Sequence, residues 1–550
     1  MQYPTLLEYM KAIQDAGNNL DKLSHLSVVL DGHGEPYHIS GDSSVVFKMQ
    51  DKTTGKCYAL KCFTKAQKGC ADASSNSSSM KYLEKELLVL SQGKEEKYPV
   101  LLMDWVDDDS LGASQLKVED MSTEATKAEL NEAITDEFSV KYSKDGRKLL
   151  KVPQKLKGTY AIKEGTKIIC DRAFEDCKSL RSLVIPNSVT SIGESAFSFC
   201  SSLKSIVLPD GITSIGDETF FGCSSLASLV IPDGVTSIGN GVFAYCGSLK
   251  NLVLPKSVVS IKGNLFCKWN GEVKCLSPNF IFEDGVLFNK DKSTIISFRD
   301  KDITSYVIPD YVTSIGGDAF SGCESLTSLV ISDSVVSIGD GAFSHCESLK
   351  NIVLPNSITG IGFCVFQHCH SLNSLVIPDS VTSIDSLAFC YCESLTSIVI
   401  PDSVTCIGNR AFEYCFSLKS LVLSKSLTSI GDWAFNTAES LKSLVIPDSV
   451  TSIGDYAFSG CRSLKSLVIS NSVTHIAVGA FLSCTSLSSV VIPDGVTSIG
   501  EGAFIGCESL KSIVIPDGVV SIEKDAFRDC NFPNDFKQKL ISRFGDKIFG

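Results

Sequence analysis

Hydrophobic positions recur along most of this chain with a period of 23 residues. The clearest marker is a phenylalanine, which returns at Phe174, Phe197, Phe220, Phe243 and Phe266, and after one interruption at Phe320, Phe343, Phe366, Phe389, Phe412, Phe435, Phe458, Phe481, Phe504 and Phe527. A fixed period in the twenties is typical of a solenoid, in which each repeat forms one short coil that stacks on the next. The pattern therefore predicts a parallel-stranded repeat solenoid of about 15 coils.

One coil, residues 180–202, shows the elements that we expect in all of them. Residues 182–186 have the β-branched, alternating composition of a strand, and a proline ends it. Residues 189–192 form a second short extended segment, and residues 194–200 are expected to make a tight helical turn that directs Phe197 inward. Each strand is expected to pair in parallel with the same strand of the next coil, about 4.8 Å away.

Features outside the repeat divide the chain into segments. Residues 142–153 predict a β-hairpin before the first coil, and residues 285–296 predict a similar one in the interruption. Because no coil can bury its apolar face alone, each array needs caps. The expected segments are a small α+β domain at 1–106, an acidic linker at 107–136, a hairpin cap at 137–172, a first array at 173–275, a hairpin insertion at 276–308, a second array at 309–530 and a helical cap at 531–550.

Cysteine is abundant, with 22 residues, and its placement is regular. In thirteen coils a cysteine follows the repeat phenylalanine by three residues, at Cys177, Cys200, Cys223, Cys246, Cys323, Cys346, Cys369, Cys392, Cys415, Cys461, Cys484, Cys507 and Cys530. One fixed position per coil indicates a column of small buried side chains. Trp269 and Ala438 replace cysteine in the same column, which fits packing better than obligatory pairing. We therefore expect reduced thiols, as in a cytoplasmic protein.

Composition and charge exclude several classes of protein. The net charge of -13 and the pI near 5.2 argue against nucleic-acid binding, because no strongly basic stretch offsets the acidity. No apolar run reaches the roughly 18–20 residues that span a bilayer, so we expect no membrane insertion. Residues 1–20 lack the basic and apolar regions of a secretory signal, and we therefore expect a cytoplasmic location.

A column of valines is the candidate partner-binding site. Strand alternation turns one valine per coil outward, between inward-facing leucine and isoleucine. These residues are Val184, Val207, Val230, Val253, Val307, Val330, Val353, Val376, Val399, Val422, Val445, Val468, Val491 and Val514. Serine and lysine lie nearby in most coils, and an apolar stripe edged by polar groups is a suitable protein-binding face. The alternative is that valine serves only strand propensity and packing along the ladder.

Histidine and cysteine concentrate in three neighbouring coils, at His345, Cys346, Cys364, His368, Cys369, His370, Cys390 and Cys392. Zinc takes such ligands. However, three of these cysteines belong to the buried column, whereas His345 and His368 share a coil position that we expect to face water. We therefore predict exposed histidines and no metal site.

The coil pattern L-x-S-L-V-I-P-x-S-V-T-S-I-G-x-x-A-F-x-x-C resembles the BspA-like leucine-rich repeats. The resemblance covers residues from about 137 to 550, and its motif recurs in every coil. It implies a right-handed, parallel-stranded solenoid that serves adhesion or protein binding, often on microbial surfaces.

The N-terminal region carries a second resemblance. Residues 41–61, which include Gly41, Val46 and Lys61, are similar to the start of a protein kinase small lobe. In that lobe a glycine-rich hairpin ends in valine, and strand three carries a lysine that holds the nucleotide phosphates. Residues 81–90 are expected to continue as strand four. Neither a His-Arg-Asp loop nor an Asp-Phe-Gly motif follows, so phosphoryl transfer cannot be assembled.

These features predict a non-enzymatic scaffold for protein interaction or adhesion that binds partners along its strand face, with no catalytic residues, cofactor or metal. The alternative is a regulatory nucleotide-binding pseudokinase with a repeat tail, in which Gly41, Val46 and Lys61 would contact ATP. A self-associating structural repeat is a third alternative.

Overall fold

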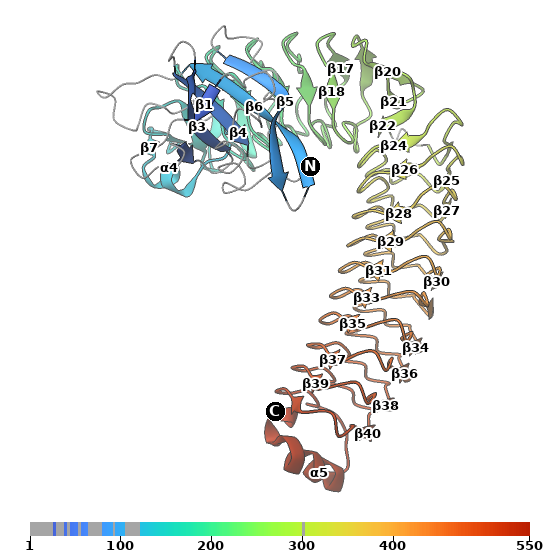
Figure 1. Cartoon of the computed structure of the whole chain (residues 1–550). Helices are drawn as coiled ribbons and strands as arrows, with labels where there is room; N and C mark the ends of the chain where they lie inside the picture. Colours follow the sequence, from blue (N-terminus) through green and yellow to red (C-terminus); the bar gives the residue numbers. More distant parts are fainter. Residues whose placement is uncertain are drawn as a thin grey trace. The chain divides into compact units, whose positions relative to one another are not determined.

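The computed structural model describes residues 122–299 and 303–550, and in the N-terminal region the stretches 26–28, 38–40, 44–52, 57–63, 80–91 and 94–104. The chain forms two compact units, Met1–Asp120 and Met121–Gly550. Figure 1 shows the sheet of the first unit in blue and the stacked coils of the second from green to red.

The first unit contains an antiparallel sheet in the order β1-β3-β4-β6-β5, with β2 paired to β3. Phe47 and Met49 on β3 are buried, as are Leu60 and Cys62 on β4. Phe47 lies directly opposite Leu60, so these four side chains share one face of the sheet. The strands are β1 (Leu26–Val28), β2 (His38–Ser40), β3 (Ser44–Asp51), β4 (Cys57–Phe63), β5 (Met80–Ser91) and β6 (Lys94–Asp104). Strand β5 covers the residues predicted as strand four.

The second unit begins with a short helix and a hairpin. Helix α4 (Lys127–Asn131) starts at a capping box, in which the side chains of Thr126 and Glu129 each accept a hydrogen bond from the other residue's backbone N–H. The antiparallel strands that follow are β7 (Ile134–Thr135), β8 (Lys141–Tyr142) and β9 (Lys148–Lys151). Strand β9 then pairs in parallel with β11 (Ile168–Ile169), the neighbouring strand of the repeat, so the hairpin covers the open end of the stack.

Most coils contribute two short strands, and these pair in parallel with the corresponding strands of neighbouring coils (Figure 1). At Ser228 and Ser374 the first strand is reduced to an isolated bridge. Residues 23 apart lie opposite each other, as Ser443 and Ser466 do. The predicted parallel-stranded solenoid is therefore confirmed. The first strands are β10 (Lys157–Ala161), β12 (Ser179–Val184), β14 (Ser205–Ile206), β17 (Asn251–Leu254), β23 (Ser305–Val307), β25 (Ser328–Val330), β27 (Asn351–Val353), β30 (Ser397–Val399), β32 (Ser420–Val422), β34 (Ser443–Val445), β36 (Ser466–Val468), β38 (Ser489–Val491) and β40 (Ile513–Val514).

The second strands are shorter and follow the proline of most coils, which is replaced by Ser332, Ser424 and Ser470 in three of them. They are β11 (Ile168–Ile169), β13 (Ser191–Ile192), β15 (Ser214–Ile215), β16 (Ser237–Ile238), β18 (Ser260–Ile261), β24 (Ser314–Ile315), β26 (Ser337–Ile338), β28 (Gly360–Ile361), β29 (Ser383–Ile384), β31 (Cys406–Ile407), β33 (Ser429–Ile430), β35 (Ser452–Ile453), β37 (His475–Ile476), β39 (Ser498–Ile499) and β41 (Ser521–Ile522).

The third side of each coil is an irregular turn, and the helical turn expected for residues 194–200 was wrong. Ser195 and Phe199 have φ angles of 53° and 57°, in the left-handed region that interrupts a right-handed helix. Their amides donate to the next coil, Ser195 to the Asp217 carbonyl at 2.8 Å and Phe199 to the Phe221 carbonyl at 2.7 Å. The stacking of coils therefore takes the hydrogen bonds that a helix would keep within itself.

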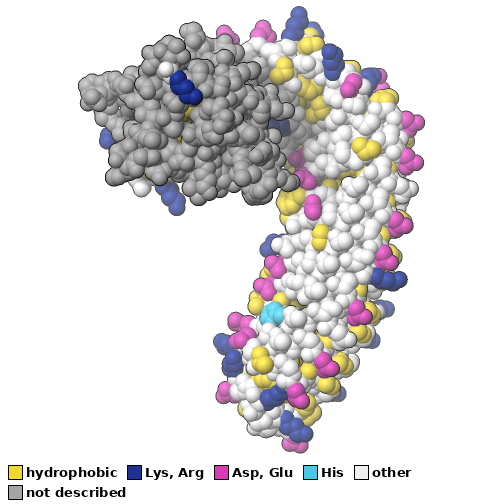
Figure 2. All heavy atoms as spheres, in the orientation of Figure 1, with side chains coloured by type: hydrophobic (Ala, Val, Ile, Leu, Met, Phe, Trp, Pro, Cys, Tyr) yellow, Lys and Arg dark blue, Asp and Glu magenta, His cyan; other side chains and the backbone are white. Residues whose placement is uncertain are grey.

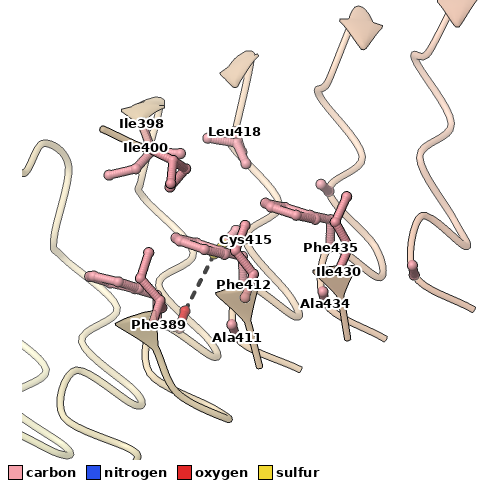
Figure 3. Close-up of a cluster of buried hydrophobic side chains, with 14 of the residues drawn as sticks. Phe389, Ile398, Ile400, Ala411, Phe412, Cys415, Leu418, Ile430, Ala434 and Phe435 are labelled. Carbon is pink, nitrogen blue, oxygen red and sulfur yellow. Dashed lines mark hydrogen bonds between the residues drawn. The ribbon is translucent and has the colours of Figure 1, made fainter. Parts of the chain in front are cut away.

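The repeat phenylalanines form a column in the core. Phe389, Phe412 and Phe435 are fully buried, and their ring centroids are 4.9 and 5.1 Å apart with nearly parallel planes (Figure 3). Ile398 and Leu418 belong to the same cluster. Aromatic rings at this separation contribute stacking in addition to the burial of their surface.

The repeat cysteines lie beside the phenylalanines and are also buried, as predicted. Most of their thiols donate to the carbonyl of the phenylalanine 26 residues earlier, as Cys415 does to Phe389 at 3.4 Å. The cysteines that the structure describes are free thiols. Trp269 replaces cysteine in one coil, and its indole N–H donates to the Leu249 carbonyl at 2.8 Å. The column thus keeps a donor to the neighbouring coil at Trp269, whereas Ala438 contributes only a small buried side chain.

The interruption holds an antiparallel meander that starts the second array. Strand β22 pairs in parallel with β24, as β9 does with β11 at the start of the first array. Asn240 Nδ2 donates to Asp318 Oδ2 at 2.8 Å, and Asn264 Nδ2 donates to the Ser321 carbonyl at 3.1 Å, which joins the two arrays. The strands are β19 (Glu272–Cys275), paired to β17, and β20 (Phe280–Glu283), β21 (Val286–Asn289) and β22 (Thr294–Phe298).

Helix α5 (Asn534–Phe544) and the 3-10 helix η1 (Asp546–Phe549) cover the last coil, within the segment predicted as a helical cap. Leu540 and Ile548 are buried in the core cluster of the second array. The Phe527 amide donates to the Ile548 carbonyl at 2.8 Å, in place of the coil that would come next. The cap therefore covers the apolar face of the final coil and accepts a hydrogen bond from its backbone.

Replacing Phe412 with alanine is expected to lower the free energy of unfolding by about 3–5 kcal/mol, because it leaves a cavity between two stacked rings. Chemical denaturation followed by circular dichroism measures the loss. Val399→Ala, at an exposed position of the same coil, is the control and should change stability by less than about 0.5 kcal/mol. An equal effect of the two substitutions would contradict the stacked core.

Candidate protein-interaction face

Strand alternation exposes one valine in each coil of the repeat. The fourteen valines expected to face outward are all exposed, from 43% for Val253 to 80% for Val207 and Val376. The residue before each of them, most often leucine or isoleucine, is buried or nearly so, as in β34, where Leu444 is buried and Val445 exposed. We call these fourteen residues the valine column: Val184, Val207, Val230, Val253, Val307, Val330, Val353, Val376, Val399, Val422, Val445, Val468, Val491 and Val514.

Within each array the valine column forms an apolar stripe, and the interruption divides the two stripes, because Val253 pairs with Lys274. Val445, Val468 and Val491 lie opposite one another in the register of β34, β36 and β38. Successive members are therefore about 4.8 Å apart. Parallel sheets are usually covered on both faces, whereas this sheet covers the core with one face and exposes its valines on the other. A long apolar stripe of this kind is typical of interaction surfaces.

Charged positions flank the valine column on both sides. Three residues before the valine, the exposed position is basic in eight coils and acidic in none. We call these residues the lysine column: Arg181, Lys204, Lys250, Lys350, Lys419, Lys442, Lys465 and Lys511. Three residues after the valine, nine coils carry an aspartate. We call these residues the aspartate column: Asp210, Asp233, Asp310, Asp333, Asp379, Asp402, Asp448, Asp494 and Asp517. Figure 2 shows blue, magenta and yellow side chains along one edge of the stack, next to a largely white face.

A second surface feature is a stack of four aromatic rings on the turn side. His345, His368, Tyr391 and Tyr414 each lie two residues after a repeat phenylalanine, and successive ring centroids are 4.4 Å apart. Partial burial, followed by nearby positive groups, lowers the pKa of His345 and His368, which favours their neutral forms. The sequence indicates the position shared by the histidines, but the tyrosines escape notice because the residue type changes along the column.

The histidine and cysteine residues of these coils do not converge on one point. Among the residues that the structure describes, no group of three or more His, Cys, Asp or Glu side chains is placed to hold a metal ion. Cys346 and Cys369 are buried and donate to carbonyls of the preceding coil at 3.2 Å. His370 Nδ1 lies 3.4 Å from Glu393 Oε1.

Two hollows lie on the second unit. The larger, about 550 Å³, is an open groove along the second strands β29, β31, β33 and β35. The smaller, about 290 Å³, lies at the junction of the arrays and is lined in part by Glu218, Tyr245, Asp318 and His345. Burial raises the pKa of Asp318, and nearby carboxylates raise it further, while the hydrogen bond from Asn240 opposes them. The larger groove spans four successive coils, fewer than the valine column does.

The N-terminal candidates lie on two paired strands. Val46 on β3 and Lys61 on β4 are direct partners in the register and therefore share a face of the sheet. Gly41 lies outside the residues that the structure describes.

Coils of 23 residues, paired in register around one apolar core, define a leucine-rich repeat solenoid. The family model of the BspA type Leucine rich repeat region (6 copies) matches residues 158–271, 295–419 and 405–533. These matches cover more than half of the sequence, and this chain therefore belongs to the BspA type leucine-rich repeat family. Proteins with such repeats are generally non-enzymatic scaffolds for protein interaction or adhesion.

Solved structures of other repeat proteins are similar to parts of this chain. A leucine-rich repeat protein from Bacteroides ovatus ATCC 8483 is 27% identical over 76% of this chain and 97% of its own, with a TM-score of 0.39. A leucine rich cell surface protein from Faecalibacterium prausnitzii A2-165 is 29% identical over 53% of this chain and 94% of its own, with a TM-score of 0.37. Because both TM-scores are low, the family assignment rests on the match to the repeat model and not on these structures. No curated protein matches the chain.

In the part of the chain that the structure describes, no helix has both the length and the apolar character needed to cross a bilayer.

Thiol chemistry tests the burial of the cysteine column. Burial raises the pKa of Cys246 to about 12 and that of Cys177 to about 11, above the value of about 8.5 in an unfolded chain. These thiols should therefore react slowly with a thiol reagent between about pH 7 and 9 and react rapidly only after denaturation. Because the pKa is raised on folding, their contribution to stability is present below about pH 8.5 and is lost as the pH rises toward 12.

Mass spectrometry of the modified peptides measures this reactivity site by site. The partly exposed Cys406 is the internal reference and should be modified before the column cysteines. Rapid modification of Cys246 and Cys177 in the folded chain would contradict the packing described above.

Proposed function

We propose that this chain is a non-enzymatic scaffold that binds a protein partner along the valine column. The observation that carries the proposal is the exposure of fourteen valines in register on the outer face of a parallel sheet. The family supports it, since BspA type repeats generally serve interaction or adhesion. A cytoplasmic location stays a prediction.

The stripe has the physical character of an interaction surface. Each exposed valine offers apolar area whose removal from water contributes about 25 cal/mol per Å². The serine, lysine and aspartate positions at its sides supply a polar rim, which contributes more to orientation and selectivity than to affinity. Because every coil presents the same pattern, a partner gains contacts in proportion to the number of coils that it covers.

Charge placed on the stripe should abolish partner binding without unfolding the chain. We expect the double variant Val376→Asp/Val399→Asp to bind at least about ten-fold more weakly, because a partner would have to bury two unpaired carboxylates. Thr382→Asp/Thr405→Asp is the matched control, since both threonines are exposed in the same coils but belong to the second-strand side.

The measurement uses the full chain, immobilised, with partners captured by the parent protein and then titrated against both variants. Equal loss of binding in the two variants, or none in either, would place the binding surface elsewhere than the valine column.

A second candidate function, nucleotide binding by the first unit, is supported by the pairing of Val46 with Lys61 on one face of its sheet. If Lys61 holds phosphates as the kinase resemblance implies, ATP should raise the melting temperature of the parent chain, because a ligand that binds only the folded state stabilises it. Lys61→Ala should lose that shift, and Lys52→Ala, at an exposed position of the same unit, should keep it. Thermal scans with and without ATP measure the shift, and no shift in the parent would exclude this function.

A further inference from the structure

The larger groove lies along β29, β31, β33 and β35, on the inner side of the curved second array (Figure 1). Its volume is about 550 Å³, and successive coils line it one after another. Repeat proteins use concave surfaces of this kind to bind extended ligands. The groove follows the second strands, whereas the valine column follows the first strands, so the two are separate surfaces.

Three residues that line this groove depart from the repeat. Phe363 occupies a position that is acidic or asparagine in most coils, and it is 48% exposed. Asp385 occupies a position that is glycine in most coils, and Cys406 replaces the serine of its column. The three residues belong to successive coils, so the departures gather at one end of the groove. A change confined to one place in a regular stack indicates a local requirement.

Packing of the coils does not account for Asp385. A Cβ atom at Gly408 would lie 2.5 Å from the amide nitrogen of Ser386, and one at Gly454 would lie 2.5 Å from that of Asp432. The close approach of neighbouring coils therefore favours glycine at this position. Asp385 instead places an exposed carboxylate there, and among the described residues this carboxylate has no hydrogen-bond or ion-pair partner.

A column of hydrogen bonds between coils is interrupted at the same end. The Phe363 amide donates to Asp340 Oδ1 at 3.0 Å. Further along, the Asp432 amide donates to Asn409 Oδ1 at 2.8 Å. Between them, the phenylalanine ring offers no acceptor to the next coil, and the amides of Ser386 and Asn409 have no acceptor in the part of the chain that the structure describes. The groove therefore offers two free backbone donors beside a free carboxylate.

These groups select the chemistry of a ligand. None of the described residues that line the groove is Lys, Arg or His. An anion would be repelled by Asp385 and Asp432, and a cation would leave the amides of Ser386 and Asn409 without an acceptor. A hydroxyl group both donates and accepts, so a ligand rich in hydroxyl groups satisfies both kinds of group. The exposed ring of Phe363 adds an apolar surface on which the C–H face of a sugar ring can stack.

The repeat of the groove also fits a chain of sugars. Its polar groups recur once per coil, about every 4.8 Å, which is close to the length of one pyranose unit. An extended peptide presents its groups on one side roughly every 7 Å and would lose register after one or two coils.

We propose that this groove binds an uncharged oligosaccharide. One sugar unit stacks on Phe363, and its hydroxyl groups bond to the Asp385 carboxylate and the Ser386 amide. The following units lie along Asn409 and Asp432, one per coil. This site is additional to the valine column, and neither depends on the other.

Calorimetric titration of the full chain with uncharged pentasaccharides of glucose, galactose, mannose and N-acetylglucosamine tests the proposal. We expect at least one of them to bind with a Kd below about 1 mM, and to bind at least about ten-fold more tightly than its own monosaccharide, because several coils contribute contacts. Absence of binding by all four at concentrations up to about 10 mM overturns the proposal.

Two substitutions restore the repeat pattern and should remove the site without unfolding the chain. Asp385→Gly returns the residue of most coils, and Phe363→Asp supplies an acceptor for the Ser386 amide, as Asp340 does for the coil that follows it. We expect each to weaken sugar binding at least about ten-fold. Phe199→Ala is the control, because Phe199 is 44% exposed in the first array and should not affect binding. Circular dichroism verifies that all three variants fold.

Three outcomes would place the ligand elsewhere or change its class. Sugar binding that survives both restoring substitutions excludes the groove. Tighter binding of tetralysine than of any sugar, with an affinity that falls as salt is raised, identifies a site for cations and overturns the proposal. The variant Val376→Asp/Val399→Asp should keep sugar binding while it loses a protein partner. Loss of sugar binding in that variant would assign the sugar to the valine column instead of the groove.

Discussion

Hydrogen bonds between the backbones of successive coils require residues 23 apart to lie directly opposite each other, and the rest of the structure follows from that constraint. A strand spacing of about 4.8 Å is too small for side chains of changing size to alternate freely. The side chains at each position of the coil therefore form a column along the stack. Phe389, Phe412 and Phe435 stack because the backbone places them there, and the thiol of Cys415 reaches the Phe389 carbonyl for the same reason.

The same constraint organises the surface. A single exposed valine would have no functional meaning, because isolated apolar residues are common on protein surfaces. Fourteen of them at one coil position become a stripe, and a lysine or an aspartate three residues away becomes a charged edge. Function in such a protein belongs to a coil position and not to one residue, which is why no compact constellation of side chains needs to form.

Much of the fold was predictable because the repeat pattern indicates which positions of each coil are buried. The phenylalanine and cysteine columns, the inward leucines and the outward valines follow from period and strand alternation alone. The turn at residues 194–200 was not predictable in this way, since its composition suits a helix and only the bonds from Ser195 and Phe199 to the next coil show otherwise. The stack of His345, His368, Tyr391 and Tyr414 depends on a shared offset that residue type conceals. Contacts such as that of Asn240 with Asp318 join residues 78 positions apart, and no local sequence pattern predicts them.

The interruption between the arrays has a mechanical consequence. The apolar interior divides there, with Leu287 in one cluster and its neighbour Val286 in the other. The arrays are joined there by polar contacts of Asn240 with Asp318, Asn264 with Ser321 and Lys268 with Glu324, and by the strands of the meander, instead of by stacked rings. Tension applied to the two ends would therefore open this seam before it peeled any coil from its neighbour. Under load the protein would lengthen in stages, as a tether with a built-in weak link.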